Sequence, residues 1–115
     1  MNDKILILSN LVKTFESTNE SLLILDHLNF EISSSEKIVI TGESGAGKST
    51  LLSIIAGLDS FNSGEIYAKN YEVHKLDEES LSNYRMNYLG LIFQFHYLLK
   101  DFTALENVML PALIA

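Results

Sequence analysis

Residues 37–56, which read KIVITGESGAGKSTLLSIIA, decide the fold. The β-branched run at 37–41 has no polar alternation, which is typical of a strand covered on both faces in a parallel sheet, so we expect the central strand here. A glycine-rich loop at 42–47 follows it, and residues 49–56 have the pattern of a helix that Gly57 can terminate. The order strand, glycine-rich loop, helix predicts an α/β fold.

Residues 42–49, GESGAGKS, match the pattern G-x-x-x-x-G-K-[ST] in the strand-to-helix context that this pattern requires. Glycines let successive backbone N–H groups point inward as an anion nest, and the positive end of the following helix points at the same place. Lys48 would bridge the β- and γ-phosphates of a nucleotide, and the Ser49 hydroxyl would join a magnesium shell. The pattern predicts nucleotide binding but not the reaction. The alternative is a glycine-rich turn that binds nothing.

The rest of the chain supplies further predicted elements around this unit. Strands are expected at 5–8 and 28–32, with a loop at 16–21 between them. A hairpin is expected from 65–67 and 71–73, with Asn70 in the left-handed conformation at its turn. Further along, we expect a helix at 77–85, a buried strand at 89–93, and a helix that begins with a capping box from Thr103 to Glu106.

Composition excludes several classes of function. The chain has 115 residues, 8 Lys and Arg against 15 Asp and Glu, a formal net charge of -7 and no Cys. So acidic a balance argues against nucleic acid as the main partner, because binding to phosphate backbones needs clustered cations. The lack of Cys excludes disulfides and Cys-ligated metals. No apolar run approaches the ~18 residues that a spanning helix needs, and no signal peptide is recognisable.

The residues around the loop resemble the ATP-binding subunits of ABC transporters. The likeness covers 42–52, 55–59 and 63–66, and it extends to 11–15 upstream and 89–94 downstream. It implies a P-loop NTPase fold of the ABC ATPase type, with N-terminal antiparallel strands and part of the RecA-like core. It also implies ATP and Mg²⁺ as cofactors. The implied nucleotide-binding residues are Phe15, which would stack on adenine, Gly42, Glu43, Ser44, Gly45, Ala46, Gly47, Lys48, Ser49, Thr50 and Gln94, of which Ser49 and Gln94 would contact Mg²⁺.

A narrower resemblance comes from 94–99 and 101–108, which are similar to the ATPase of the lipoprotein-releasing system. That ATPase powers extraction of lipoproteins from the bacterial inner membrane, and exporters of the macrolide or cell-division type share part of the run. The resemblance implies transmembrane permease subunits and a second ATP-binding subunit as partners. It also implies a cytoplasmic location, peripheral on the inner membrane through the permease.

The sequence departs from the family pattern in two ways. Turn positions differ, because Ser35 and Asn70 stand where the family usually has Gly, and Phe61 and Lys100 where it usually has Pro. Nothing in residues 1–115 matches the LSGGQ signature, the Walker B strand with its catalytic Glu, the D-loop or the switch His. We therefore expect residues 1–115 to be a partial ABC ATP-binding domain that binds ATP at most and has no catalytic residue of its own.

Two other interpretations of the whole chain stay open at this point. One is a nucleotide- or partner-binding remnant without turnover, and the other is an unrelated P-loop enzyme such as a small kinase. Incompleteness has a physical consequence in any case, because a central strand at 38–40 without parallel neighbours would expose its edge. The apolar residues Phe102, Leu105, Val108 and Met109 recur at helical spacing, which indicates a core face, with contact to a partner as the alternative.

Overall fold

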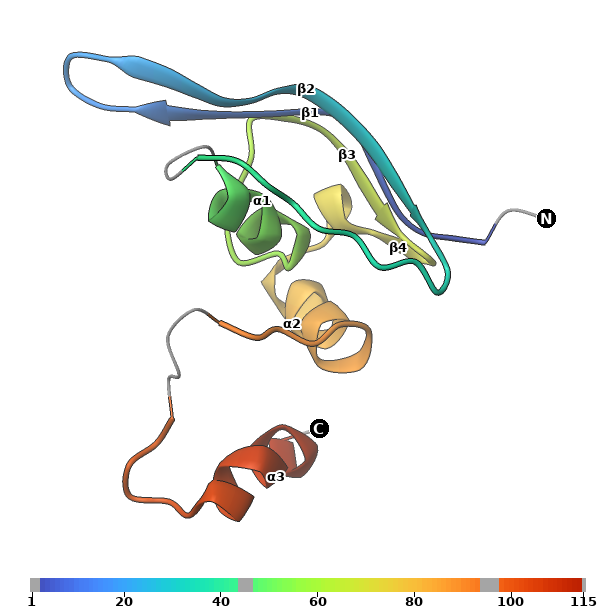
Figure 1. Ribbon diagram of the computed structural model, residues 1–115, viewed down its shortest axis with the longest axis vertical. Coiled ribbons are helices and arrows are strands. Elements are labelled where there is room, and N and C mark those ends of the chain that lie inside the picture. The colour runs from blue at the N-terminus through green and yellow to red at the C-terminus, as the bar shows by residue number, and fades with distance from the viewer. Residues whose placement is uncertain (1–2, 44–46, 94–97, 115) are drawn as a thin grey trace.

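The computed structural model describes residues 3–43, 47–93 and 98–114. Strands β1 (Lys4–Glu16) and β2 (Ser21–Ser33) form a long antiparallel hairpin, and β3 (Ser63–Ala68) pairs antiparallel with the other edge of β1. The short strand β4 (Tyr71–Glu72) pairs with β3, so the sheet has the order β2-β1-β3-β4 (Figure 1). The predicted antiparallel N-terminal strands and the predicted hairpin are confirmed.

Strand β1 extends well beyond the predicted segment at 5–8 because a local irregularity hides its pattern. Buried positions alternate up to Leu8 and resume at Leu11, so the period of two is broken once. Asn10 lies between them with a φ of 50°, and the pairing of β1 with β2 changes register there. A bulge of this kind shifts every later side chain to the other phase. The strand therefore continues to Glu16, although buried and exposed positions do not alternate regularly over its whole length.

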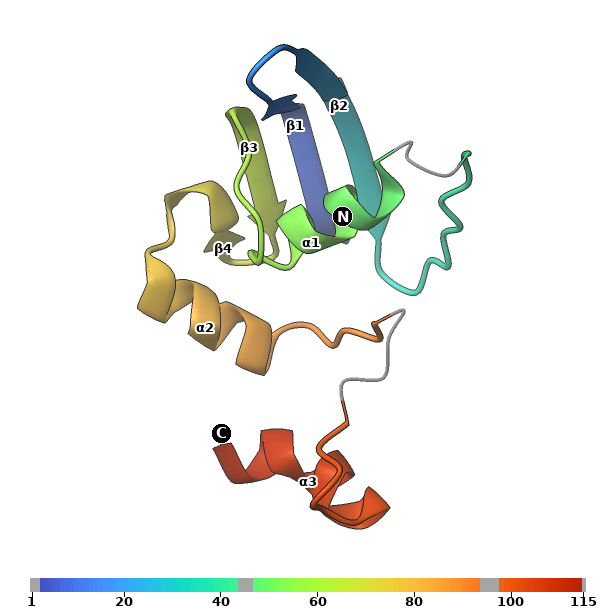
Figure 2. The same cartoon turned by 90° about the vertical axis from the view of Figure 1, so that its left-hand side faces the viewer.

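The helices follow the glycine-rich loop and the hairpin. They are α1 (Lys48–Ile55), the 3₁₀ turn η1 (Val73–Lys75), α2 (Glu78–Asn87) and α3 (Ala104–Ile114). Helix α1 lies against one face of the sheet, with α2 beyond it and α3 farther away (Figure 2). The core joins the sheet, α1, η1 and α2, and consists of Leu6, Leu8, Leu11, Leu25, Leu51, Ile54, Ile66, Ala68, Val73 and Tyr84.

Local signals place the helix ends. Gly57, with a φ of 75°, follows the C-cap of α1 as predicted. The Asp77 side chain accepts a hydrogen bond from the Ser80 amide at 2.8 Å and caps α2. Before α3, the Thr103 amide donates to Glu106 Oε1 at 2.8 Å, and the Glu106 amide donates to Thr103 Oγ1 at 3.1 Å, which is the predicted capping box.

Tyrosine hydroxyls fasten α2 to the rest of the fold. The fully buried Tyr84 donates from its hydroxyl to the main-chain oxygen of Ile55 at 2.8 Å, next to the end of α1. Tyr88 donates to the main-chain oxygen of Ile5 in β1, also at 2.8 Å. The rings of Tyr71, Tyr84 and Tyr88 pack together with centroid distances of 5.2–5.8 Å. These contacts anchor α2 to α1, β1 and β4. Tyr88 and Ile5 are 83 residues apart in the sequence.

The predicted strands at 37–41 and 89–93 are wrong. Neither segment is in a strand among the described residues, and both expose their apolar side chains: Val39 is 83% exposed and Ile92 102%. A parallel strand forms only when a neighbour supplies the other half of its hydrogen bonds. The described strands all belong to one antiparallel sheet, and that sheet ends at β2 and β4.

Two smaller predictions are also corrected. The left-handed residue at the β3–β4 turn is Lys69, with a φ of 53°, and not Asn70. The core assignment of the α3 stripe fails as well, because α3 has no buried residue among those described, and Leu105 and Val108 are 67% and 76% exposed. The spacing of apolar residues does not distinguish a helix face in the core from one that binds a partner, since apolar residues repeat with the helix turn in both.

Candidate functional site

The glycine-rich loop leads directly into α1, as the sequence predicted. Helix α1 begins at Lys48, one residue earlier than expected, and Gly47 stands at its N-cap in the left-handed conformation with a φ of 94°. No side chain of the described residues caps this end, and the first turn of α1 contains no acidic residue. Unpaired N–H groups and the partial positive charge at a helix start both favour an anion. The start of α1 therefore fits a phosphate group.

Gly47 is required at this N-cap by packing as well as by its backbone angle. A Cβ atom on Gly47 would lie 2.6 Å from Cγ2 of Ile24 in β2. A larger residue at this position would force Ile24 or the start of α1 to shift. Gly47 therefore allows α1 to begin close against the β1–β2 hairpin.

The Lys48 ammonium turns back onto the loop that precedes it. Its Nζ atom donates to the main-chain oxygen of Gly42 and, at 3.1 Å, to that of Glu43. An ammonium has three donor hydrogens, so it can hold these two oxygens and still donate to a third acceptor such as a phosphate oxygen. Glu43 takes part through its main chain here.

Ser49 and Thr50 occupy the first turn of α1, where Ser49 is exposed and Thr50 half-buried. Mg²⁺ binds oxygen ligands and usually combines one or two protein groups with water and substrate phosphates. Within residues 3–43, 47–93 and 98–114, no group of three or more His, Asp and Glu could hold a metal ion. The Ser49 hydroxyl is an exposed oxygen at this helix start, and a Mg²⁺ ion shared with a phosphate-bearing ligand would need only one or two such protein groups. Ser44, Gly45, Ala46 and Gln94 lie outside the described residues.

Phe15 stands at the end of β1 with 54% of its surface exposed, so its ring can stack on a flat ligand. Two positions earlier on the same strand, the buried Lys13 lies with its ammonium 5.4 Å from the centre of the Phe15 ring. Lys13 is not among the site residues predicted from the sequence. Its alternation with Leu11 and Phe15 places it on one face of β1 but does not reveal its partners.

Residues 25–113 match the family described as ABC transporter. The chain belongs to the ABC transporter family. Membership in this family implies nucleotide binding, and it excludes the unrelated P-loop enzyme that the sequence analysis left open.

Curated members of the ABC transporter family match the whole chain. It is 64% identical over 115 residues to the lipoprotein-releasing system ATP-binding protein LolD of Treponema denticola, and 50% identical to LolD of Treponema pallidum. Both alignments cover 100% of this chain and 51% of the relative. The chain thus spans about half the length of the curated relatives it matches, and the predicted resemblance to the lipoprotein-releasing ATPase is confirmed.

A solved ABC structure shares the fold. The ATP-binding cassette MJ0796, in a dimeric post-hydrolysis state bound to ADP and Pi, matches with a TM-score of 0.89 and 38% identity. The match covers 95% of this chain and 47% of that one. The predicted fold class, an incomplete domain of the ABC ATPase type, is confirmed. The described helices include none that is both long and apolar enough to cross a membrane.

Proposed function

We propose that this chain is the ATP-binding part of a bacterial ABC transporter of the lipoprotein-releasing type. The observation that carries the proposal is the start of α1, where Gly47 is left-handed, Lys48 reaches the carbonyl oxygens of Gly42 and Glu43, and the first turn contains no acidic residue. The 64% identity to a protein named as the ATP-binding protein of the lipoprotein-releasing system supports the type of transporter.

The proposed site assigns each region of ATP to part of the chain. The loop from Gly42 through Ser44, Gly45 and Ala46 to Gly47, with Lys48 and Thr50, holds the phosphates through backbone N–H groups and the ammonium. Ser49 and Gln94 are the proposed protein ligands of Mg²⁺. Phe15 is proposed to stack on adenine with its exposed ring.

In this proposal residues 1–115 bind ATP and do not hydrolyse it. Nothing in residues 1–115 matches a Walker B strand with a following catalytic Glu, the residue that would act as a general base on water. Hydrolysis and lipoprotein extraction belong to an assembly with a second ATP-binding subunit and transmembrane permease subunits, on the cytoplasmic face of the inner membrane. The second candidate is a nucleotide-binding remnant without transport, which the half-length match to LolD also fits.

Nucleotide titration with a matched pair of lysine variants tests the site. We expect the chain to bind Mg·ATP, measured by calorimetry, and Lys48→Ala to weaken binding about 100-fold or more, because a charge-assisted contact to phosphate is lost. Lys69→Ala removes the same charge at the exposed β3–β4 turn and should leave the affinity unchanged. Equal losses in both variants would place the site elsewhere. If the parent chain fails to bind saturating Mg·ATP, the proposed function is wrong.

A phosphate-release assay on the same samples tests the absence of turnover. We expect release from Mg·ATP to stay at the rate of the Lys48→Ala variant. Release by the parent chain above that rate, and lost in Lys48→Ala, would contradict the proposal that hydrolysis needs more than residues 1–115.

A further inference from the structure

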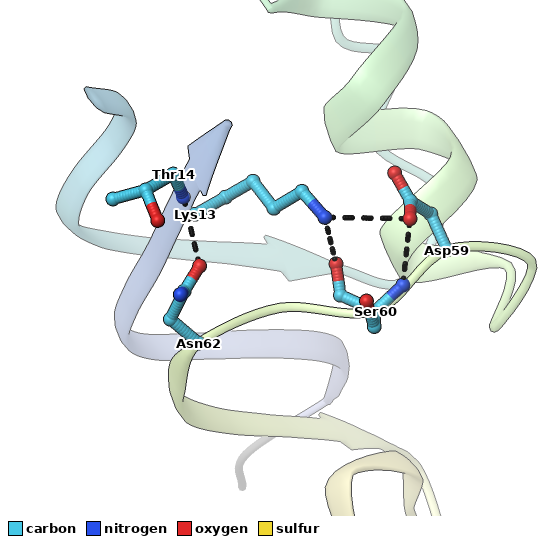
Figure 3. A network of polar contacts seen from close by, with 5 residues as sticks. All are labelled: Lys13, Thr14, Asp59, Ser60 and Asn62. Atoms are coloured by element: carbon cyan, nitrogen blue, oxygen red, sulfur yellow. Dashed lines mark hydrogen bonds and ion pairs between the residues drawn. The ribbon is translucent and has the colours of Figure 1, made fainter. Parts of the chain in front are cut away.

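Among the residues that the structure describes, Lys13 is the charged residue that is buried, with 8% of its surface exposed. Its Nζ atom donates to the main-chain oxygen of Ser60 at 2.7 Å and lies 3.4 Å from Asp59 Oδ1 (Figure 3). The third close neighbour is the ring of Phe15, 5.4 Å from Nζ. A buried ammonium persists only when such partners replace its water, so the contacts of Lys13 define a fixed position for it.

The loop that receives Lys13 is itself tied to β1. Asp59 Oδ1 accepts a hydrogen bond from the Ser60 amide at 2.8 Å, which orients the carboxylate toward Lys13. Asn62 Oδ1 accepts from the Thr14 amide at 2.8 Å, and the Asn62 amide donates to the Val12 oxygen at 2.8 Å. Figure 3 shows the contacts among Lys13, Asp59 and Ser60 beside the contact of Thr14 with Asn62. The segment at 59–62 is therefore hydrogen-bonded to β1 at the three residues before Phe15. We refer to these contacts as the clamp.

The same part of the hairpin lies against the start of α1. Gly47 packs against Ile24, whose neighbours in β2 pair with β1 at Lys13 and Thr14. Phe15 is in β1, and Gly47 lies beside Ile24 in β2, the strand that pairs with β1. The Lys13 ammonium contacts Phe15, Asp59 and Ser60.

We propose that Lys13 is a positioning residue for the base end of the nucleotide site. Its ammonium holds the Phe15 ring through a cation–π contact and locks the end of β1 onto the loop that follows α1. The ring keeps a set orientation and offers its exposed surface to a purine. This inference rests on the proposed function, and it predicts that Lys13 affects recognition of the base and not of the phosphates.

The experiment compares two ligands on the full chain: Mg·ATP, and magnesium tripolyphosphate, which has phosphates but no base. We expect Lys13→Met to weaken Mg·ATP binding about three- to tenfold, as fits the loss of a partly desolvated cation–π contact. Tripolyphosphate affinity should not change. Lys13→Arg keeps the charge over the ring and should stay within about twofold of the parent.

Two comparisons separate this role from a structural one. In a Phe15→Ala background, Lys13→Met should cause no further loss of Mg·ATP affinity, because the two residues act as one unit. Lys4→Met is the matched control, since Lys4 is an ion-paired lysine of the same strand, 3.2 Å from Glu31. It should affect neither ligand. If Lys13→Met does not fold, Asp59→Asn weakens the same clamp from its partly exposed side and should give the same selective loss.

The outcomes that overturn the inference are distinct from failure of the proposed function. Equal weakening of both ligands by Lys13→Met, or no weakening of either, would show that Lys13 does not act at the base. An undiminished loss in the Phe15→Ala background would show that it does not act through the ring. If the parent chain binds tripolyphosphate but gains nothing from the base, the phosphate site stands and the role of Lys13 is refuted. If the parent binds neither ligand, the proposed function fails, and this inference fails with it.

Discussion

Ser35 holds a backbone conformation that serine adopts at a cost. Its φ is 67° in the turn between β2 and the segment at 37–43. A Cβ atom is crowded in this left-handed region, which glycine tolerates. The family resemblance implies Gly at this place, and the angle gives a physical reason for it.

Ser35→Gly is expected to raise the free energy of unfolding by roughly 0.5–1 kcal/mol. Glycine removes the strain of the left-handed conformation, and this gain exceeds the cost of the larger conformational entropy that glycine has in the unfolded chain. Urea denaturation followed by circular dichroism measures it. Ser34→Gly is the control, because Ser34 has no positive φ and glycine there should only destabilise. A similar change in both variants would contradict the explanation by strain.

Tyr84 combines full burial with one hydrogen bond, to the Ile55 oxygen. Tyr84→Phe should lower the free energy of unfolding by about 1 kcal/mol, because the Ile55 oxygen loses its donor. Burial raises the pKa of Tyr84 to about 12. Since the folded pKa exceeds the unfolded value, the unfolded chain loses this proton first, and stability falls as pH rises from 10 towards 12.

Urea denaturation at pH 9 and pH 11 checks this sign. Wild type should lose more stability over that interval than Tyr84→Phe, which lacks the titrating group. Leu81→Ala is the control, because it removes partly buried apolar contacts of α2 without removing a titrating group, and its loss between the two pH values should match that of wild type. Parallel losses in wild type and Tyr84→Phe would refute the assignment.

Helix α2 begins at a side-chain N-cap, and Tyr84 is its one buried residue among those described. Asp77→Ala should fray the first turn of α2, seen as faster hydrogen exchange of amides 80–82. The amide of Ser80 lowers the pKa of Asp77 below its ordinary value of 3.8. The cap therefore stabilises α2 above that value and is lost as pH falls through the lower folded pKa.

The control for this cap is Glu79→Ala, which removes a carboxylate from the same turn without removing a hydrogen bond to the Ser80 amide. It should leave the protection of amides 80–82 nearly unchanged. If both variants exchange equally fast, the helix dipole and not the cap would account for the effect.

At this scale, the sequence predicts elements whose signals are local. Asp77 and the Thr103–Glu106 box mark helix starts within one residue, because the cap and its helix are neighbours in the chain. Strand β1 was predicted for only part of its length, since the irregularity at Asn10 hides its period. The strands at 37–41 and 89–93 were predicted wrongly, since apolar composition does not reveal whether a neighbouring strand is present.

In the candidate site, too, the local features were predicted from the sequence and the long-range contacts were not. The start of α1, with Gly47 and Lys48, follows from a contiguous pattern and lies where it was predicted. Lys13 was missed because its partners, Asp59 and Ser60, are 46 and 47 residues away. Contacts over such separations depend on how the strands pair, and the sequence pattern of one segment does not contain that information.

The whole molecule exposes apolar side chains over several segments outside its core. Ile38, Val39, Leu91 and Ile92 are 37–102% exposed, and α3 adds Leu105 and Val108. Exposure on this scale is typical of surfaces that associate. We therefore expect residues 1–115 to self-associate and to bind the dye ANS.

A pair of double variants tests this expectation by analytical ultracentrifugation. Val39→Lys with Ile92→Lys should lower both the apparent mass and the ANS fluorescence, because charge is placed where the apolar segments are exposed. Leu22→Lys with Leu23→Lys adds the same charge at residues of β2 that are 50–57% exposed, and should lower them less. A monomeric parent chain without ANS binding would contradict the prediction.

The central position of β1 also governs the order in which the molecule can be assembled on a ribosome. The β1–β2 hairpin is complete at Ser33, but β3, which covers the other edge of β1, begins only at Ser63. At roughly 5–20 residues per second, that edge waits about 1.5–6 seconds for its partner. During this time its unpaired N–H and C=O groups can accept a strand from another nascent chain. The contact between Tyr88 and Ile5 forms later still, so the first strand to be synthesised is among the last to be secured.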